Sequence, residues 1–350
     1  MPDSKRTPKT PTKETHNKLN IAFITTRFGH QFGGAEAYGV ELMRELAKTH
    51  QITVIGYEYD KECGLILPFI PVHNPQRLPS WIRSYLFARQ AEHILNTKQF
   101  DIVHSHVGGW SADVDVLHVR SAAYRWFYAP NTVHRILNTL SPRSQMYRWL
   151  EKQRIHEHPK ACTVMVSKQI KEQIQAAYST RFDFPVIPPG VHLPHNDHTA
   201  RHSIRHTFNL QEHDRLCLLV AREPKRKGFD TLLNSLKYLP DTIKFLVVGV
   251  APEQLASYER LAVTKQLHNR LFFVEQTPHI HDYYQAADIY VHPTLNDSFG
   301  MAPLEAMSHS LPVIMSNARY CGFAHYAHNQ HNCLLLNDPR DSKEFAQALL

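Results

Sequence analysis

Short apolar runs alternate with longer stretches of helical period along most of the chain, a pattern typical of a parallel sheet flanked by helices. The apolar runs are rich in β-branched and aromatic residues, which favour strands. In the first half we predict strands over Leu19–Thr25, Gln51–Tyr57, Asp101–Ser105, Val114–Val119 and Ala161–Val166, and helices over Ala35–Lys48, Ser80–Thr97, Arg143–His158 and Ser167–Tyr178.

The same alternation restarts in the second half. The predicted strands there are Leu216–Ala221, Ile243–Gly249, Leu271–Val274, Ala287–His292, Leu311–Met315 and Asn332–Leu336, and a last helix covers Asp341–Leu350. Between the halves lies the segment FPVIPPGVHLP (184–194), whose four prolines and one glycine cannot continue a helix or a central strand. We therefore predict a hinge, with a disordered basic tail over 1–18 and two α/β domains over 19–190 and 191–350. Such domains would enclose a cleft at the carboxyl ends of their strands.

Composition narrows the class of protein. Hydrophobic residues make up 43% of the 350 residues, and no apolar stretch is long enough to cross a bilayer. Residues 1–18 lack the apolar core of a signal peptide, so we expect a cytoplasmic protein. Five scattered cysteines without a CxxC pair argue against a disulfide framework or a zinc knuckle, and we predict Cys162 and Cys217 to be small core residues. The 25 histidines include no HExxH, and we expect no metal site.

The positive charge is concentrated in two regions. Residues 1–18 hold five Lys/Arg against two acidic residues, and residues 76–155 hold eleven against five. Within the second region, residues 77–89 and 120–128 interleave arginines with Trp, Tyr and Phe, as suits an anionic membrane interface. The alternative is that the aromatic residues are core and the arginines a solvated face. No nucleic-acid-binding module is present, so we expect no nucleic-acid partner.

A glycine turn follows the first predicted strand. Gly33 and Gly34 open the next helix, and the free N–H groups and positive dipole end of a helix suit a diphosphate. The spacing is not GxGxxG and no acidic residue stands suitably at the end of the second strand, so a dinucleotide site is disfavoured. The alternative is a tight turn that simply needs glycine.

Two histidines are expected at strand ends. His106 ends the run DIVHSH, and His118 ends the next predicted strand. Each is either a residue of the cleft or a buried, hydrogen-bonded histidine of the core.

The second half carries a cation pair. Arg222 stands at the carboxyl end of its predicted strand, and Lys227 precedes a glycine at the start of a helix. Fixed cations there could hold a diphosphate and stabilise charge on a leaving nucleotide. The neighbouring Lys225 and Arg226 are interpreted as a solvated basic loop.

The segment DSFGMAPLE (297–305) joins a strand to a helix through a turn at Gly300. Asp297 could accept hydrogen bonds from sugar hydroxyls, while the backbone N–H groups of the turn donate. Glu305 lies about one turn inside the predicted helix, in an apolar stretch where an unpartnered carboxylate would be costly. It could accept from both hydroxyls of a ribose.

Together these segments resemble glycosyltransferase family 4, the retaining enzymes of the GT-B fold, over nearly all of residues 19–350. DSFGMAPLE (297–305) has the spacing of the family's E-x7-E motif, and runs into the familiar EAM and LPVI. Arg222 and Lys227 look like its diphosphate-binding cation pair, and GGAE (33–36) like its glycine turn. The segments IPPGV (187–191), VSKQI (166–170) and CGFAHY (321–326) look most similar to lipopolysaccharide-core α-glucosyltransferases.

The resemblance implies two Rossmann-like domains, the N-terminal one on the acceptor side and the C-terminal one binding a nucleotide sugar. It implies transfer of a hexose, glucose, from a UDP-sugar with retained anomeric configuration and with no metal ion or other cofactor. No enzyme nucleophile is expected, and the departing phosphate would help to deprotonate the acceptor. The candidates for catalysis are His106, Arg222, Lys227 and Asp297, and those for donor binding are Gly33, Gly34, His118, Phe299, Gly300, Met301 and Glu305.

The acceptor that the resemblance implies is a lipopolysaccharide-core or similar membrane glycolipid. The enzyme would then be peripheral on the inner face of the cytoplasmic membrane, which it would meet through residues 76–155.

Two features depart from the family pattern. Asp297 is one methylene shorter than the commoner Glu, which leaves the sugar open, and the chain stops before the C-terminal helices of the second domain. A shortened homologue acting as a binding or assembly partner is therefore one alternative. A GT-B nucleotide-sugar epimerase or a phosphorylase is another, although neither extra acids and histidines in the cleft nor a pyridoxal lysine is evident.

Overall fold

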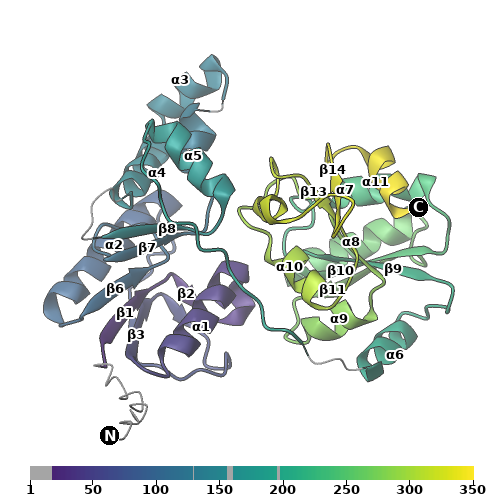
Figure 1. Cartoon of the computed structure of the whole chain (residues 1–350), viewed down its shortest axis with the longest axis horizontal. Helices are drawn as coiled ribbons and strands as arrows, with labels where there is room; N and C mark the ends of the chain where they lie inside the picture. Colours follow the sequence, from purple (N-terminus) through teal and green to yellow (C-terminus); the bar gives the residue numbers. More distant parts are fainter. Residues whose placement is uncertain (1–17, 129, 156–160, 195–197) are drawn as a thin grey trace, which may run out of the picture.

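The structure is a computed structural model that describes residues 18–128, 130–155, 161–194 and 198–350. It divides them into two α/β domains that lie side by side (Figure 1). The predicted tail over 1–18 lies outside the described residues except for Lys18.

The N-terminal domain is built on six parallel strands in the order β5-β3-β1-β6-β7-β8. A small parallel pair, β2 (Arg27–Phe28) and β4 (Glu58–Tyr59), lies beside this sheet. The six strands are β1 (Asn20–Ile24), β3 (Gln51–Gly56), β5 (Phe69–Pro71), β6 (Ile102–Ser105), β7 (Val114–Leu117) and β8 (Cys162–Met165). The helices are α1 (Gly34–Leu46), α2 (Ser80–Thr97), α3 (Thr132–Leu140), α4 (Pro142–Gln153) and α5 (Lys168–Tyr178).

Alternation along β1 explains why both faces of this sheet are covered. Phe23 packs in one cluster with Met43 of α1, whereas Ile24 packs in another with Phe87 of α2. Successive side chains of a strand point to opposite faces, so a strand that is apolar at every position needs a helix on each side.

The C-terminal domain repeats the plan, with six parallel strands in the order β11-β10-β9-β12-β13-β14. The strands are β9 (Arg215–Val220), β10 (Ile243–Val250), β11 (Leu271–Glu275), β12 (Ile289–His292), β13 (Val313–Ser316) and β14 (Leu334–Leu336). The helices are α6 (His198–Thr207), α7 (Phe229–Ser235), α8 (Pro252–Thr264), α9 (Ile280–Ala286), α10 (Met301–Ser308) and α11 (Ser342–Leu349). Helices α9 and α10 contribute to the cluster on one face, and α7, α8 and α11 to the cluster on the other.

Both sheets have the strand order of a doubly wound fold. In each, the direction of winding reverses beside the first strand, between β1 and β6 in one domain and between β9 and β12 in the other. Ligands of such sheets bind at this reversal, outside the carboxyl ends of the strands. The prediction of two parallel α/β domains is therefore confirmed.

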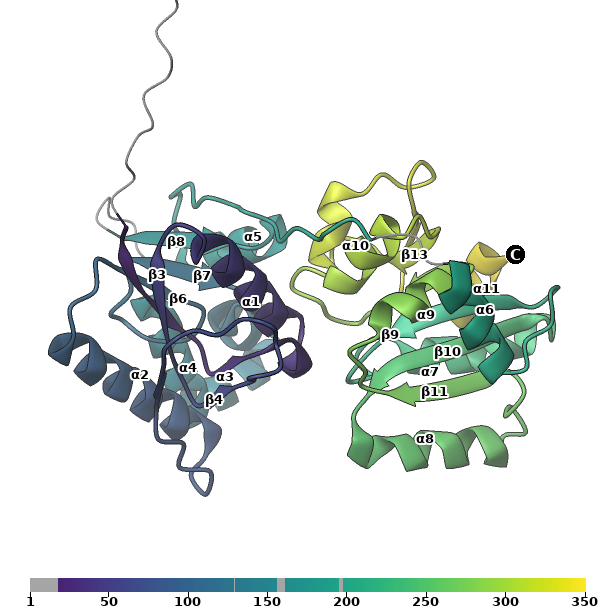
Figure 2. The same cartoon turned by 90° about the horizontal axis from the view of Figure 1, so that it is seen from below.

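Direct hydrogen bonds join the two domains. Ser167 Oγ donates to the carbonyl of Ser298 at 2.6 Å, and Gln169 Nε2 donates to the carbonyl of Ala318 at 2.9 Å. Ser167 is the N-cap of α5, and Ser298 lies three residues before α10. Figure 2 shows α5 and α10 on the two sides of the junction.

One core prediction is wrong. Cys217 is fully buried in β9, as predicted, but Cys162 is exposed. Cys162 is the first residue of β8, where the strand has not yet entered the core, and the apolar residues after it are the buried ones.

Candidate active site

Lys227 and Asp297 follow the two strands that flank the reversal in the C-terminal sheet. Lys227 lies in the loop after β9, and its Nζ pairs with Asp297 Oδ2, in the segment after β12. The loop must approach closely, because a Cβ on Gly228 would lie 1.9 Å from the carbonyl oxygen of Pro293. Gly228 also has a φ of 91°, in the left-handed region that glycine adopts readily. The sequence predicted both charged residues but not their pairing.

A residue that the sequence analysis missed completes this group. His292, the last residue of β12, is fully buried, and its Nε2 lies 3.0 Å from Asp297 Oδ2. Its Nδ1 lies 3.2 Å from the hydroxyl of Tyr290. Burial alone would raise the pKa of Asp297, but the Lys227 charge and the His292 hydrogen bond outweigh it and hold that pKa well below its usual range. Asp297 is therefore a carboxylate at neutral pH.

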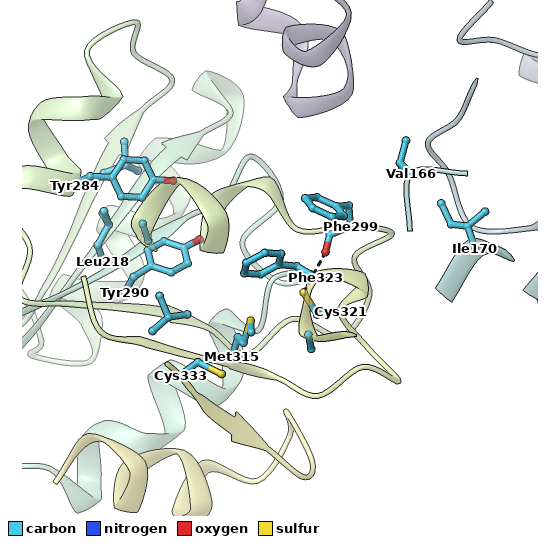
Figure 3. Packing of buried hydrophobic residues seen from close by; sticks show 14 of the residues in the cluster. Val166, Ile170, Leu218, Tyr284, Tyr290, Phe299, Met315, Cys321, Phe323 and Cys333 are labelled. Atoms are coloured by element: carbon cyan, nitrogen blue, oxygen red, sulfur yellow. Dashed lines mark hydrogen bonds between the residues drawn. The ribbon is translucent and has the colours of Figure 1, made fainter. Parts of the chain in front are cut away.

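Glu305 has a buried partner of its own. It lies on α10 and accepts a hydrogen bond of 2.7 Å from the hydroxyl of Tyr284, which is fully buried on α9. Figure 3 shows the Tyr284 ring within the hydrophobic cluster, with its hydroxyl at the edge that faces α10. Burial raises the pKa of Glu305, and the Tyr284 hydrogen bond offsets part of that shift. Only one carboxylate oxygen takes the Tyr284 bond, so the other can accept from a ligand.

Two helix N-termini meet at the domain junction. Gly33 precedes α1 with a φ of 143° and Gly300 precedes α10 with a φ of 104°, and neither helix is capped by a side chain. The two turns lie close together, since a Cβ on Gly34 would be 3.4 Å from Met301 Cγ. The junction thus combines two positive helix ends, which favour a bound anion.

Arg222, from the C-terminal domain, contacts the glycine turn that precedes α1. Its Nη1 donates to the carbonyl of Phe32, immediately before Gly33, at 2.9 Å. The sequence placed Arg222 and the glycine turn in different domains, and the structure brings them into contact. Lys225 and Arg226, interpreted as a solvated loop, are both exposed, although Arg226 also donates to the carbonyl of Asn296.

Phe299 belongs to the core rather than to an open surface. It is 5% exposed, and its carbonyl accepts from the N–H of Phe323 and from Cys321 Sγ (Figure 3). These bonds fix the turn that presents Gly300 and Met301 at the junction. Any contact of Phe299 with a ligand would have to come from its backbone.

The predicted histidines lie together beside the reversal of the N-terminal sheet. The ring centroids of His106 and His118 are 4.3 Å apart, and His106 Nε2 is 3.1 Å from His104 Nε2. Burial lowers the pKa of His104 to about 4 and that of His118 to about 3, so both are neutral at neutral pH. Nε2 of His118 is buried and has no hydrogen-bond partner among the described residues.

Metal ligands do not gather in this part of the molecule. Within the described ranges, no group of three or more His, Cys, Asp or Glu side chains is arranged to hold a metal ion. The expectation of a reaction without a metal ion or other cofactor stays a prediction.

Comparison with known proteins gives the same division of the chain. The family model described as Glycosyltransferase Family 4 matches residues 32–194, and the model described as Glycosyl transferases group 1 matches residues 200–350. The lipopolysaccharide glucosyltransferase WaaG of Escherichia coli K12 is 21% identical over 346 residues, which cover 94% of this chain and 88% of WaaG. The phosphatidylinositol N-acetylglucosaminyltransferase GPI3 subunit of Saccharomyces cerevisiae is 24% identical over 85% of this chain and 67% of its own length.

Solved structures share the fold. The crystal structure of WaaG superposes with a TM-score of 0.81 at 20% identity, covering 94% of this chain and 89% of WaaG. That of Anabaena Alr3699/HepE in complex with UDP and glucose superposes with a TM-score of 0.70 at 16% identity, covering 94% and 88% of the two chains. The family models match both domains of the fold, and the chain accordingly belongs to the GT-B glycosyltransferases, with a Glycosyltransferase Family 4 domain followed by a glycosyl transferases group 1 domain.

Proposed function

We propose that this glycosyltransferase transfers glucose from a UDP-sugar to a lipopolysaccharide-core or similar membrane glycolipid, with retention of the anomeric configuration. The observation that carries the proposal is the junction itself. Two helix N-termini, the cations Arg222 and Lys227 and the carboxylates Asp297 and Glu305 gather where the sheet of the C-terminal domain reverses. Such a set complements a nucleotide diphosphate bonded to a sugar.

Each group has a task in this proposal. Glu305 is oriented by the hydrogen bond from Tyr284, and its other carboxylate oxygen accepts hydrogen bonds from the ribose hydroxyls. Arg222, Lys227 and the turns at Gly33–Gly34 and Gly300–Met301 bind the diphosphate and stabilise the charge that grows on it as the glycosidic bond breaks. Asp297 accepts from the sugar hydroxyls. Catalysis then consists of positioning and electrostatic stabilisation, with the departing phosphate taking the proton of the acceptor hydroxyl.

His106 and His118 lie on the acceptor side of this arrangement. Both follow strands of the N-terminal sheet at its carboxyl edge, and Tyr38 of α1 stacks on the His106 ring with centroids 5.7 Å apart. A neutral imidazole can donate from one nitrogen and accept on the other. We assign them to hydrogen bonding with the transferred sugar or the acceptor.

The membrane glycolipid is supported by the exposed side of α3. Four of its apolar side chains are more than half exposed: Val133, Ile136, Leu137 and Leu140. The helix projects from the N-terminal domain at the top of the view in Figure 1. Exposed arginines lie on α3 and on the neighbouring segments: Arg125, Arg135, Arg143 and Arg148.

An apolar helix face among cations suits the interface of an anionic bilayer. Among the described residues, no helix is long and apolar enough to cross a membrane. We therefore propose peripheral attachment through α3, within the region 76–155, at the inner face of the cytoplasmic membrane where such acceptors would be reached.

A donor screen tests the proposal. Purified protein is incubated with UDP- and GDP-sugars in parallel, with a lipopolysaccharide-core acceptor, and release of the nucleotide is followed. We expect UDP-glucose to give acceptor-dependent UDP release, and NMR of the product to show the α-anomer. Turnover with another sugar only would replace glucose, and an inverted product would refute retention.

A further inference from the structure

Asp297 has one fixed partner and one movable one. His292 is fully buried at the end of β12, whereas the side chain of Lys227 is 14% exposed and reaches Asp297 from a loop. Both partners bind the same oxygen, Oδ2. A long lysine side chain can change partner by rotating its stem, but a buried imidazole between Asp297 and Tyr290 cannot.

The hydrogen bonds determine the form of His292. Asp297 is ionised beside Lys227, so its oxygen can only accept, and His292 Nε2 must donate to it. Burial lowers the pKa of His292, and the Asp297 bond offsets only part of that shift, so the ring is neutral. Nδ1 of a neutral ring with a proton on Nε2 is an acceptor, and the hydroxyl of Tyr290 donates to it. Asp297 thus sets the tautomer of His292, and the Tyr290 hydroxyl complements it by donating to Nδ1.

In the proposed function Lys227 binds the donor phosphate, and its ion pair with Asp297 opposes that binding. Lys227 Nζ is bonded to Asp297, but the donor phosphate needs the same cation. A phosphate that binds Lys227 therefore competes with Asp297. Once Lys227 leaves, the half-buried carboxylate keeps its charge only if another donor remains.

We propose that His292 is a positioning residue that holds Asp297 in place while Lys227 changes partner from that carboxylate to the donor phosphate. This proposal rests on the proposed function, in which Lys227 contacts the diphosphate and Asp297 the sugar. Donor binding then does two things at once: it neutralises the phosphate and frees an oriented carboxylate for the sugar.

The proposal has three consequences for the affinity of UDP, which has no sugar and therefore engages Lys227 but not Asp297. Asp297→Asn releases Lys227 and should tighten UDP binding about fivefold. His292→Leu leaves Asp297 dependent on Lys227 and should weaken UDP binding about fivefold. In the Asp297→Asn background no charge needs His292, so His292→Leu should change the affinity by less than about twofold.

The experiment is a double-mutant cycle by calorimetry with UDP, on the full chain, with transfer from UDP-glucose measured in parallel. Both Asp297→Asn and His292→Leu should lower the rate of transfer, although they change UDP affinity in opposite directions. His292→Gln, which keeps an N–H near the position of Nε2, should restore most of the UDP affinity and transfer. This rescue separates loss of the hydrogen bond from loss of the fold, which thermal unfolding of each variant also monitors.

Equal weakening of UDP binding by His292→Leu in both backgrounds would overturn the proposal, because a purely structural residue acts alike in both. If Asp297→Asn binds UDP as tightly as the wild-type chain or more weakly, Lys227 does not leave Asp297 for the phosphate, and the proposal is refuted. If the wild-type chain neither binds UDP nor transfers glucose, the proposed function itself fails, and that result is distinct from an additive cycle.

Discussion

Glu305 combines burial with one hydrogen-bond partner, and this combination makes its charge sensitive to pH. Its pKa is raised by burial and partly restored by the Tyr284 hydroxyl. Ribose hydroxyls donate to a carboxylate but find a weaker acceptor in the protonated acid. The affinity for UDP should therefore be highest at a pH above the raised pKa of Glu305, and it should decline as the pH falls through that pKa.

Removing the Tyr284 hydroxyl should move this transition to higher pH. Tyr284→Phe deletes a bond that stabilises the carboxylate, so the pKa of Glu305 rises further. Calorimetry with UDP from about pH 5 to about pH 8 measures the midpoint. Tyr283→Phe is the matched control, because Tyr283 is the neighbouring residue on α9 and, within the described part of the chain, Glu305 takes its tyrosine hydrogen bond from Tyr284. Identical pH profiles for the two variants would show that the Tyr284 hydroxyl does not affect the ionisation of Glu305.

Lys227 and Lys225 offer a second matched comparison, two residues apart in one loop. Lys225 is exposed, whereas Lys227 lies against Asp297 at the junction. Lys227→Ala should lower transfer from UDP-glucose about 100-fold, because a cation that stabilises the leaving group is lost. Lys225→Ala should retain near wild-type rates. Similar losses in both variants would show that the loop contributes only its general positive charge.

The candidate residues of this site were predictable one at a time, but their pairing was not. A glycine beside a cation is a local pattern, and so is a carboxylate eight residues before a helical glutamate. The bond between Lys227 and Asp297 joins residues 70 positions apart, and no local pattern encodes it. His292 was not predicted as a site residue, because a polar residue that follows an apolar run usually marks only the end of a strand.

At the level of elements, the predicted strands and helices agree with the structure where the apolar pattern is long. Helix α2 has the predicted bounds, Ser80–Thr97. Strand β5 was missed because it has three residues and ends in a proline. Helix α3 was missed although Val133, Ile136, Leu137 and Leu140 have helical spacing. That spacing predicts a helix with one apolar face. Such a face usually packs against the core, but the apolar face of α3 is exposed.

The exposed face of α3 leads to a prediction about membranes. Replacing Ile136, Leu137 and Leu140 together by serine should lower binding to anionic vesicles at low salt about tenfold or more, because the apolar contact with the interface is lost. Vesicle flotation measures the bound fraction. Val263→Ser, at a 64% exposed valine on α8 of the other domain, is the control and should bind normally. Unchanged flotation of the triple variant would place the membrane contact elsewhere.

At the level of the whole molecule, the candidate active site combines residues of both domains. Gly33, Gly34 and the histidines come from the N-terminal domain, and the charged residues come from the C-terminal domain. The contacts of Arg222 with Phe32, and of Ser167 with Ser298, hold the two edges together. The alternation of strands and helices along the sequence predicted two domains. It does not encode the strand order of each sheet or the relative orientation of the two sheets, which depend on three-dimensional packing.

We propose that Glu305 binds the nucleotide of the donor at this junction. The most direct test is the calorimetric affinity of UDP for the wild-type chain and for Glu305→Ala, with thermal unfolding confirming that the variant is folded. We predict measurable binding by the wild-type chain and a loss of about 100-fold or more in the variant, because two hydrogen bonds to a charged group disappear. Equal affinity of the two proteins for UDP would contradict the account.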